Sequence, residues 1–361
     1  MKLLVLKETI ENENRVAITP DLLAKYQKLG IEVFVETKAG IKSGISDDVF
    51  EKAGAKILPD INSILLEVDI IIAVQRVEID LKKLKPSAIF IALLNPHLQP
   101  ETVAFFKENK IAAFALELLP RITRAQTMDV LSSQSNLAGY RAVIDAVYEL
   151  PKAVPMMMTA AGTISAAKFM IIGAGVAGLQ AIATARRIGG IVCAFDVRTA
   201  AKEQVQSLGA KFIEVKDESS EANNGVYAKE MSEDYKKRQE QLLKDTIKSQ
   251  DVVITTALIP GKKAPILISE EMVLGMKSGS IIVDLAAVNG GNCALTESGK
   301  IKEVNGVKII GYDNFSSRLA ADASKLFSKN IFNFLELLVD KTNNKISINL
   351  EDEIVKATFI G

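Results

Sequence analysis

A stretch from Phe169 to Arg198, FMIIGAGVAGLQAIATARRIGGIVCAFDVR, holds the residues of this chain that are best suited to binding a ligand. Gly173, Gly175 and Gly178 stand in the spacing GxGxxG, directly after an apolar run and at the start of an alanine-rich segment. Three glycines alone are a weak signal. Here they lie between a predicted strand and a predicted helix, and a second strand follows, which is the context that dinucleotide binding requires. The stretch therefore predicts a dinucleotide site.

Each glycine of this turn has its own steric reason. Gly173 permits the tight turn, Gly175 lets a pyrophosphate approach the backbone, and Gly178 lets the helix pack closely against the strand. The amides at the helix N-terminus then face the negative charge of the pyrophosphate.

Asp196 ends the second strand, about 20 residues after the glycine turn. Its carboxylate is expected to accept hydrogen bonds from the adenosine ribose and to repel a 2′-phosphate, which favours NAD(H) over NADP(H). Arg198 favours the opposite prediction, NADP(H), because a nearby arginine can hold a 2′-phosphate. Since the carboxylate comes first at the strand end, we predict NAD(H). The predicted cofactor-binding residues of this stretch are Gly173, Ala174, Gly175, Val176, Gly178, Asp196, Val197 and Arg198.

Two further loops are expected beside this site. The segments TTALIPGKKAPIL and VDLAAVNGGNC each follow an apolar strand. Ligands of open α/β sheets bind at the carboxyl ends of the strands. Leu258 in the first loop and Asn289 in the second are the candidates to line the site, and an ordinary loop role for both is the open alternative.

A polar joint, RITRAQTMD, runs from Arg121 to Asp129 between an apolar strand and a predicted helix. Polar loops are common at protein surfaces, so the local sequence favours a solvated connector. The alternative is a place where the chain meets a polar ligand. We call residues 121–129 the polar joint.

A long polar excursion, KDESSEANNGVYAKEMSEDYKKRQEQ, interrupts the second half of the chain. Connections between strands and helices in α/β units usually take about 2–6 residues. The excursion is either a passive surface feature or a flap over a site. In the second case Gly225 supplies conformational freedom and Tyr227 an aromatic tip.

The composition excludes several classes of protein. The 44 basic residues balance the 44 acidic residues, so no overall field favours nucleic acid or an anionic membrane. Cys193 and Cys293 lie far apart and make no metal-ligand spacing, which indicates reduced thiols and no metal site. The apolar runs fall short of the roughly 20 residues that a membrane helix needs, so we expect any membrane part to belong to another chain.

Short apolar runs with helical segments between them would position these residues. The runs are too apolar to alternate, which is typical of parallel strands covered on both faces. The pattern predicts the α/β class, with two Rossmann-like, doubly wound parallel-sheet domains and a cleft between them. A helix at residues 130–150 joins the domains, and an amphipathic segment at residues 316–340 returns to the first. The predicted domains are residues 1–130 with 316–361, and residues 131–315.

With these residues in hand, the chain resembles the alanine dehydrogenase/transhydrogenase family, and within it the soluble NAD(H)-binding subunit of proton-translocating NAD(P) transhydrogenases. The resemblance covers nearly the whole length. It rests on the segments KET…ENRVAITP, LLPRITRAQTMDVLSSQSNLAGYRAV, GAGVAGLQAIATARRIG, GVYAKEMSEDY, TTALIPGKKAPIL and VDLAAVNGGNC.

This resemblance implies a function and an assembly. The chain would take hydride to or from NAD(H), and a separate domain on another chain would hold NADP(H). A membrane domain, also on another chain, would couple the transfer to proton translocation. The resemblance further implies a homodimer in the cytoplasm, peripherally associated with the inner membrane through its partner subunits.

The resemblance also assigns the polar joint to the nicotinamide end of the cofactor. It implies that Asp129 and Ser132 hold the carboxamide, that Gln126 reaches toward the nucleotide of the partner, and that Arg121 lies beside them. The family's mobile loop matches Gly225 to Tyr235. The implied catalytic residues are Arg121, Gln126 and Asp129, and the implied additions to the cofactor-binding set are Ser132, Gly225 and Tyr227. Leu258 completes that set because of the position of its loop.

Two other functions stay open. Alanine dehydrogenases must clamp a carboxylate and move a proton. Arg15 fits such a clamp, but this chain has Gln75 and Asn95 where the dehydrogenases carry a catalytic lysine and a catalytic histidine, and its only histidine is His97. The remaining alternative is an NAD-sensing module without a hydride partner.

Overall fold

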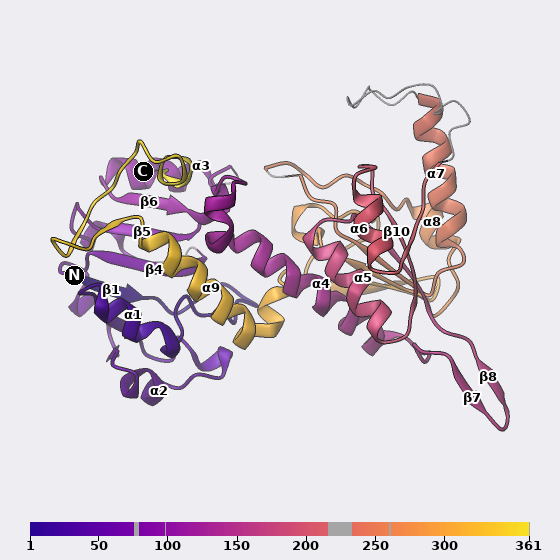
Figure 1. The fold of residues 1–361 in the computed structure, drawn as a ribbon, viewed down its shortest axis with the longest axis horizontal. Helices are drawn as coiled ribbons and strands as arrows, with labels where there is room; N and C mark the ends of the chain where they lie inside the picture. The colour runs from indigo at the N-terminus through magenta and orange to yellow at the C-terminus, as the bar shows by residue number, and fades with distance from the viewer. Residues whose placement is uncertain (76–78, 98, 216–232, 260, 361) are drawn as a thin grey trace. The chain divides into compact units, whose positions relative to one another are not determined.

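The computed structural model of the chain describes residues 1–75, 79–97, 99–215, 233–259 and 261–360. The chain folds as two compact units (Figure 1). Met1–Ser135 and Ser316–Gly361 form the first unit, and Asn136–Phe315 forms the second. The boundaries expected from the sequence lie at residues 130 and 315. Each unit is built on a sheet whose strands are all or mainly parallel, so the predicted α/β class is confirmed.

The sheet of the first unit has six parallel strands in the order β3-β2-β1-β4-β5-β6. The central strand β4 explains the unbroken apolar sequence, because Ile70 and Ile72 enter one core cluster while Ile71 and Ala73 enter the cluster on the opposite face. The strands are β1 (Lys2–Val5), β2 (Glu32–Glu36), β3 (Lys56–Leu58), β4 (Ile70–Gln75), β5 (Ile89–Leu93) and β6 (Ala112–Ala115).

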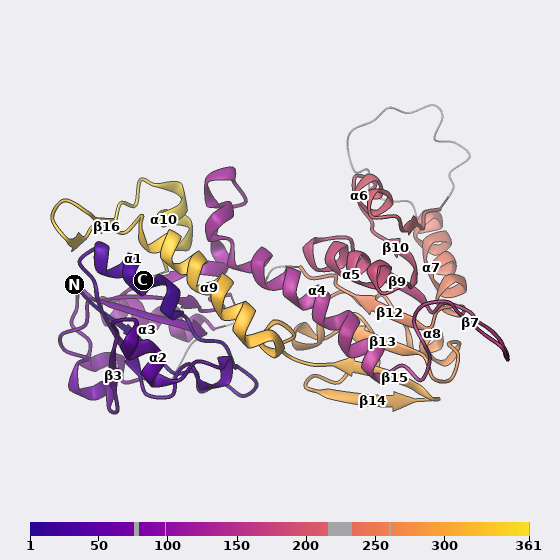
Figure 2. The same cartoon turned by 60° about the horizontal axis from the view of Figure 1, so that its bottom comes forward.

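The helices of the first unit cover both faces of its sheet. Helix α9 (Ala320–Leu335) returns to this unit and buries Phe327, Ile331 and Phe334 in the same cluster as Ile70 (Figure 2). The other helices are α1 (Leu23–Lys28), α2 (Asp47–Lys52), α3 (Pro100–Glu108) and α10 (Glu353–Thr358), with short 3-10 turns at Pro20–Leu22, Ile41–Ser43, Ile61–Ser63, Leu81–Lys83, Leu116–Leu118, η6 (Thr123–Met128) and Ser316–Leu319.

The sheet of the second unit has seven strands in the order β11-β10-β9-β12-β13-β15-β14. All neighbours are parallel except β14 and β15. Phe169 and Ile171 of β9 face one core cluster, and Met170 and Ile172 face the other. The strands are β9 (Lys168–Ile172), β10 (Ile191–Phe195), β11 (Lys211–Phe212), β12 (Val252–Thr255), β13 (Ile281–Asp284), β14 (Lys300–Val304) and β15 (Val307–Gly311).

A long helix, α4 (Val130–Glu149), carries the chain from the first unit into the second. The second unit also contains α5 (Val176–Arg187), α6 (Ala201–Ser207), α7 (Glu233–Ile247), α8 (Glu270–Leu274) and the 3-10 turn Ala287–Asn289.

The apolar runs did not predict every strand. Edge strand β14 has the charged sequence KIKEV, so it lacks the apolar signal of the central strands. Two small antiparallel hairpins were also missed, β7 (Met157–Thr159) with β8 (Gly162–Ile164) and β16 (Val339–Asp340) with β17 (Lys345–Ile346). The β7–β8 hairpin extends away from the sheet of its own unit (Figure 1).

Candidate functional site

The glycine-rich turn joins β9 to α5 in the second unit. Gly173 has a φ of +100°, and a Cβ atom there would lie 2.5 Å from Thr256 Oγ1. A Cβ atom on Gly178 would lie 1.8 Å from the Gly173 carbonyl oxygen. On Gly175, by contrast, a Cβ atom would meet no protein atom within 4 Å. Packing within the protein therefore explains the first and third glycines, and the second faces open space.

The N-terminus of α5 lies at this open space. Gly175 is its N-cap residue and offers no side chain to the amides of the first turn. Uncapped amides at a helix N-terminus attract anions, because they are unsatisfied donors at the positive end of the helix dipole. Val176, the first residue of the helix, is partly exposed. The turn thus fits the pyrophosphate of a dinucleotide.

Asp196 lies directly after β10 and accepts four hydrogen bonds. The Ala174 amide donates to Oδ2 at 2.7 Å, and the Arg198 amide donates to Oδ1 at 2.8 Å. The Arg198 guanidinium donates to both oxygens at 3.0 Å. Burial alone would raise the pKa of the Asp196 carboxyl, but the bonds from Arg198 and Ala174 outweigh it and lower this pKa.

The pairing of Asp196 with Arg198 bears on cofactor recognition. Four hydrogen bonds use the acceptor capacity of a carboxylate, so a ribose hydroxyl could bind Asp196 only by replacing donors of Arg198. The Arg198 side chain is mostly exposed, so it can leave without unpacking the core. Val197, between them, is exposed as well.

Two loops at the same sheet edge are held together by Asn292, which is fully buried. Its amide nitrogen donates to the carbonyl oxygens of Ala257 at 2.9 Å and Pro265 at 2.8 Å, and its oxygen accepts from the Ala257 amide at 3.0 Å. Asn292 thereby fixes the start and end of the loop after β12. Leu258 lies in this loop with 52% of its surface exposed.

Asp284, at the end of β13, organises the neighbouring loop and is also fully buried. Asn289 ends a 3-10 turn in this loop, and its carbonyl accepts from the Ala264 amide at 2.8 Å. Sequence reasoning missed Asp284 and Asn292, although a polar residue at the end of an apolar strand was the available signal. The donors to Asp284 are Thr255 Oγ1, Thr296 Oγ1 and the amides of Ala286, Asn292 and Cys293.

The polar joint belongs to the first unit and is mostly the 3-10 turn η6. Ala125 and Met128 are buried in the core, and Gln126 between them is exposed. Asp129 follows as the cap residue, and the amide and hydroxyl of Ser132 donate to its carboxylate at 2.9 Å and 2.5 Å. The structure therefore pairs two of the predicted residues with each other and presents a third to solvent.

The two ends of the polar joint differ in how they are held. Arg121 is exposed and has no ion pair among the described residues. Arg124 donates to both oxygens of Asp352, at 2.6 Å and 2.8 Å, and this lowers the pKa of Asp352 to about 2. Asp352 caps α10, where it accepts from the Ile354 amide at 2.9 Å. Sequence reasoning missed this tie, because 228 residues separate its partners.

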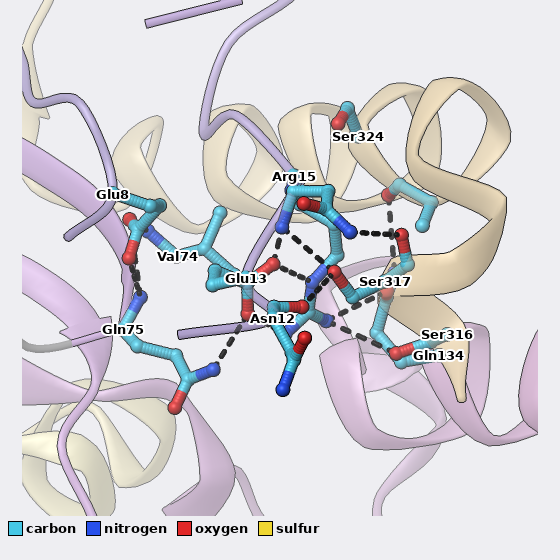
Figure 3. Close-up of polar contacts among 12 residues, drawn as sticks. Glu8, Asn12, Glu13, Arg15, Val74, Gln75, Gln134, Ser316, Ser317 and Ser324 are labelled. Carbon is cyan, nitrogen blue, oxygen red and sulfur yellow. Dashed lines mark hydrogen bonds and ion pairs between the residues drawn. The ribbon is translucent and has the colours of Figure 1, made fainter. Parts of the chain in front are cut away.

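A second polar cluster of the first unit surrounds Arg15, which is only 4% exposed (Figure 3). Its Nε and Nη2 atoms donate to the two oxygens of Glu13 at 2.8 Å and 2.6 Å. Its Nη1 atom donates to Gln134 at 2.9 Å and to Ser316 at 3.3 Å. Gln75 donates to Glu13 at 2.6 Å. The arginine that fits a substrate clamp thus already binds a carboxylate of its own chain.

Glu8 extends this cluster to the end of β4, as Figure 3 shows. It accepts from the Val74 amide at 2.6 Å and from the Gln75 amide at 3.3 Å. Burial and the neighbouring Glu13 carboxylate raise the pKa of Glu8 to about 8. For Glu13 the Arg15 guanidinium outweighs burial and holds the pKa of that carboxyl below its ordinary value.

Asn95 stands where alanine dehydrogenases carry a catalytic histidine, and an asparagine side chain does not transfer protons as a histidine does. Asn95 adopts a left-handed φ of +46° after β5, and its backbone amide donates to the Glu117 carboxylate. Burial raises the pKa of the Glu117 carboxyl. His97 is exposed.

The described residues include neither the predicted flap nor a metal cluster or membrane helix. Gly225 and Tyr227, and the predicted loop around them, fall outside the described residues. Within the described ranges, no group of three or more His, Cys, Asp or Glu side chains could hold a metal ion. In the same portion of the chain, no helix combines the length and apolarity needed to cross a membrane.

Comparison with known proteins places the chain in a family. The model of the alanine dehydrogenase/PNT N-terminal domain matches residues 4–138, and that of the C-terminal domain matches residues 142–360. The chain belongs to the alanine dehydrogenase/PNT family. The resemblance inferred from the motifs is therefore confirmed.

Within the alanine dehydrogenase/PNT family, the transhydrogenases are more similar to this chain than the alanine dehydrogenases. The first part of NAD(P) transhydrogenase subunit alpha of Rhodospirillum rubrum is 51% identical over 369 residues, which cover 100% of this chain and 96% of that protein. Alanine dehydrogenase of Bacillus subtilis is 30% identical over 289 residues, 79% of this chain and 70% of that protein.

The chain is also similar to a solved transhydrogenase structure over nearly its whole length. The crystal structure of transhydrogenase from Sinorhizobium meliloti superposes with a TM-score of 0.91 at 48% sequence identity, covering 99% of this chain and 98% of that one.

Proposed function

We propose that this chain binds NAD(H) and exchanges hydride with NADP(H) on a partner chain, as the NAD(H)-binding subunit of a proton-translocating transhydrogenase. The observation that carries the proposal is the arrangement of the polar joint. Gln126 is exposed beside the hydrogen-bonded pair of Asp129 and Ser132, and such groups are suited to holding an amide. The full-length similarity to a protein named as the first part of an NAD(P) transhydrogenase subunit alpha supports it.

The contribution of the chain to this reaction is positional. When bound, NADH supplies a hydride from its nicotinamide ring, and NADP⁺ on the partner accepts that hydride with its electron pair. No O–H or N–H bond is broken, so no general base is needed. The reacting atoms must instead be held about 3–3.5 Å apart. Asp129 and Ser132 hold the carboxamide, Gln126 reaches the partner nucleotide, and Arg121 flanks them.

The remaining cofactor contacts come from the second unit. The uncapped amides at Gly175 bind the pyrophosphate. Asp196 accepts hydrogen bonds from the adenosine ribose once the Arg198 side chain has released its own bonds to Asp196. Because the Asp196 carboxylate is ionised, it disfavours a 2′-phosphate, and NAD(H) is the cofactor of this chain. The proposed cofactor-binding set is Ser132, Gly173, Ala174, Gly175, Val176, Gly178, Asp196, Val197, Arg198, Gly225, Tyr227 and Leu258.

The proposal includes partners. The name of the Rhodospirillum rubrum relative, which marks it as one portion of a subunit, implies further portions in that protein, and we extend this to the present chain. One partner holds NADP(H), and a membrane domain couples hydride transfer to proton translocation, which brings the chain to the cytoplasmic side of the inner membrane. We also propose a homodimer, which the exposed apolar residues of the β7–β8 hairpin support.

The alternative is an alanine dehydrogenase, and the Arg15 cluster argues against it. A substrate carboxylate would have to displace Glu13 from two hydrogen bonds in a buried place. Gln75, at the position of the catalytic lysine of the dehydrogenases, donates to that same Glu13. An amide there can neither give nor take a proton as a lysine does.

The experiment that tests the proposal is hydride exchange between NADH and an NADP⁺ analogue, with and without the NADP(H)-binding partner chain. We expect transfer only with the partner present, tighter binding of NADH than of NADPH to the chain alone, and no useful oxidation of alanine with NAD⁺. Turnover of alanine at about 1–10³ per second would instead identify a dehydrogenase.

A further inference from the structure

The polar joint is supported by helix α9, which comes from the other end of the chain. Ala125 and Met128 of η6 lie in the same core cluster as Phe327 and Ile331 of α9. A 3-10 turn has poor internal hydrogen-bond geometry and depends on such outside support. The precise placement of Gln126 therefore depends on what α9 contributes.

Two asparagines of α9 converge on one carbonyl of the joint. Asn330 and Asn333 stand three positions apart, on one side of the helix, and both donate to the Thr127 carbonyl, at 2.8 Å and 3.0 Å. A carbonyl oxygen has two lone pairs, so both bonds can form at once. Thr127 directly follows Gln126, so these bonds fix the backbone next to that side chain.

Asn330 makes a second bond that Asn333 does not. The Ser133 hydroxyl donates to Asn330 Oδ1 at 2.7 Å, and Ser133 directly follows Ser132 on α4. The Asn330 amide thus bridges the Gln126 side and the Ser132 side of the joint, with Asp129 between them. It is 7% exposed, so water is poorly placed to replace either bond if the amide is removed.

We propose that Asn330 is a positioning residue for hydride transfer, and that its amide sets the distance between the Gln126 side and the Ser132 side of the polar joint. The inference rests on the proposed function. Asn330 touches no reacting atom. It acts through the Thr127 carbonyl and the Ser133 hydroxyl, so its loss should impair transfer more than NADH binding, which the second unit largely provides.

The test uses single-turnover transfer at saturating NADH in the complex with the NADP(H)-binding partner, together with calorimetric NADH titration and thermal unfolding. Because a misplacement of about 1 Å can cost on the order of 100-fold, we expect Asn330→Ala to slow transfer about 10- to 100-fold while the NADH dissociation constant changes less than about threefold. Ser133→Ala breaks the bridge from its other end and leaves α9 intact. In the double variant, the loss of transfer rate should be clearly smaller than the product of the two single losses, since the two residues share one contact.

Two control variants separate positioning from stability. Asn333→Ala leaves the Asn330 bond to the Thr127 carbonyl in place and removes only the bond from a partly exposed side chain, which water can replace, so the transfer rate should stay within about threefold. Ser328→Ala removes a buried acceptor of the Thr19 amide on the same helix, away from the joint, and should lower the melting temperature without slowing transfer at saturation.

The outcomes distinguish the inference from the proposed function. If the unaltered complex transfers hydride and both Asn330→Ala and Ser133→Ala transfer at the same rate, the positioning role is wrong while the proposed function stands. A rate loss in Ser328→Ala equal to that in Asn330→Ala would reduce the effect to stability and would also overturn the inference. If the unaltered complex does not transfer hydride, the proposed function fails and the inference falls with it.

Discussion

Gln126 is the residue of the polar joint whose chemistry is most open to test. It is exposed, and its backbone carbonyl accepts from the Asp129 amide at 3.3 Å, so its place in the joint does not depend on its side chain. A change to this side chain should therefore act on the reaction and leave the fold as it is.

Gln126→Asn should impair hydride transfer far more than NADH binding. Shortening the side chain by one methylene withdraws the amide by roughly 1.5 Å, and misplacements of about 1 Å can cost on the order of 100-fold in rate. The measurement is single-turnover transfer in the reconstituted complex beside NADH titration of the free chain. Weaker NADH binding with a normal rate at saturation would make Gln126 a binding residue instead.

Glu8 and Glu13 are neighbouring buried carboxyl groups whose pKa values are shifted in opposite directions. Both are buried, but Glu13 receives two hydrogen bonds from the Arg15 guanidinium, whereas Glu8 receives only backbone amides and faces the Glu13 carboxylate. Glu13 therefore stays ionised. The pKa of Glu8 is raised from 4.5 to about 8, so Glu8 is protonated at neutral pH in the folded protein.

The raised pKa of Glu8 predicts how stability changes with pH. Between pH 4.5 and 8 the folded state holds a proton on Glu8 that the unfolded state has lost, so the free energy of unfolding falls as pH rises through this window and levels off above it. Glu8→Gln keeps the shape and cannot ionise. Its melting temperature should match the unaltered protein near pH 5 and exceed it at pH 9. Glu108→Gln, at an exposed position on α3, is the control. Parallel pH curves for the Glu8 variant and the unaltered protein would contradict the raised pKa.

At the scale of elements, the β9–α5 turn contains one glycine that packs against the protein and one glycine that faces open space. Gly178 lies against the Gly173 carbonyl, and Gly175 lies against nothing within 4 Å. The φ of Gly175 is −80°, which any residue adopts. A methyl group added at either position thus tests a different property of the same turn.

Gly178→Ala should lower the free energy of unfolding by at least about 1–3 kcal/mol, the usual cost of overpacking. Gly175→Ala should melt like the unaltered protein, but bind NADH at least about tenfold more weakly, a loss of about 1.4 kcal/mol. Thermal unfolding measures the stability of the two variants, and calorimetry measures their NADH affinity. If Gly175→Ala binds NADH normally, no ligand approaches this residue closely.

At the scale of the whole molecule, the β7–β8 hairpin exposes apolar side chains to solvent. A lone two-stranded hairpin is marginally stable in water. This one exposes 40% of Met157 and 81% of Met158, and Met156, directly before it, is 62% exposed. Apolar side chains on a projecting arm are expected where another chain covers them.

If the proposed homodimer uses this arm, Met158→Asp should dissociate it to monomers at micromolar concentration while each monomer still binds NADH. Sedimentation equilibrium measures the first property and calorimetry the second. Leu66→Asp, at a position that is 74% exposed in the first unit, is the matched control and should leave the dimer intact. An unaltered protein that sediments as a monomer would refute the homodimer, and an intact Met158→Asp dimer would place its interface elsewhere.

The sequence alone determined the features that depend on neighbours along the chain. Continuous apolar runs such as Ile70–Val74 predicted parallel strands, because both faces of such a strand are buried. The spacing of Gly173 and Gly178 predicted a turn and a close helix, and the structure gives both glycines a steric reason. Edge strand β14 escaped prediction, because an exposed edge strand needs no apolar run.

Only the tertiary structure decided which distant side chains meet. Asn330 reaches the Thr127 carbonyl across 203 positions, and Arg124 reaches Asp352 across 228. It also decided that Arg15 is occupied by Glu13. The physical reason is that strand and turn signals are set by local periodicity and backbone sterics, whereas a side-chain hydrogen bond between distant segments exists only after packing has brought its donor within about 3 Å of its acceptor.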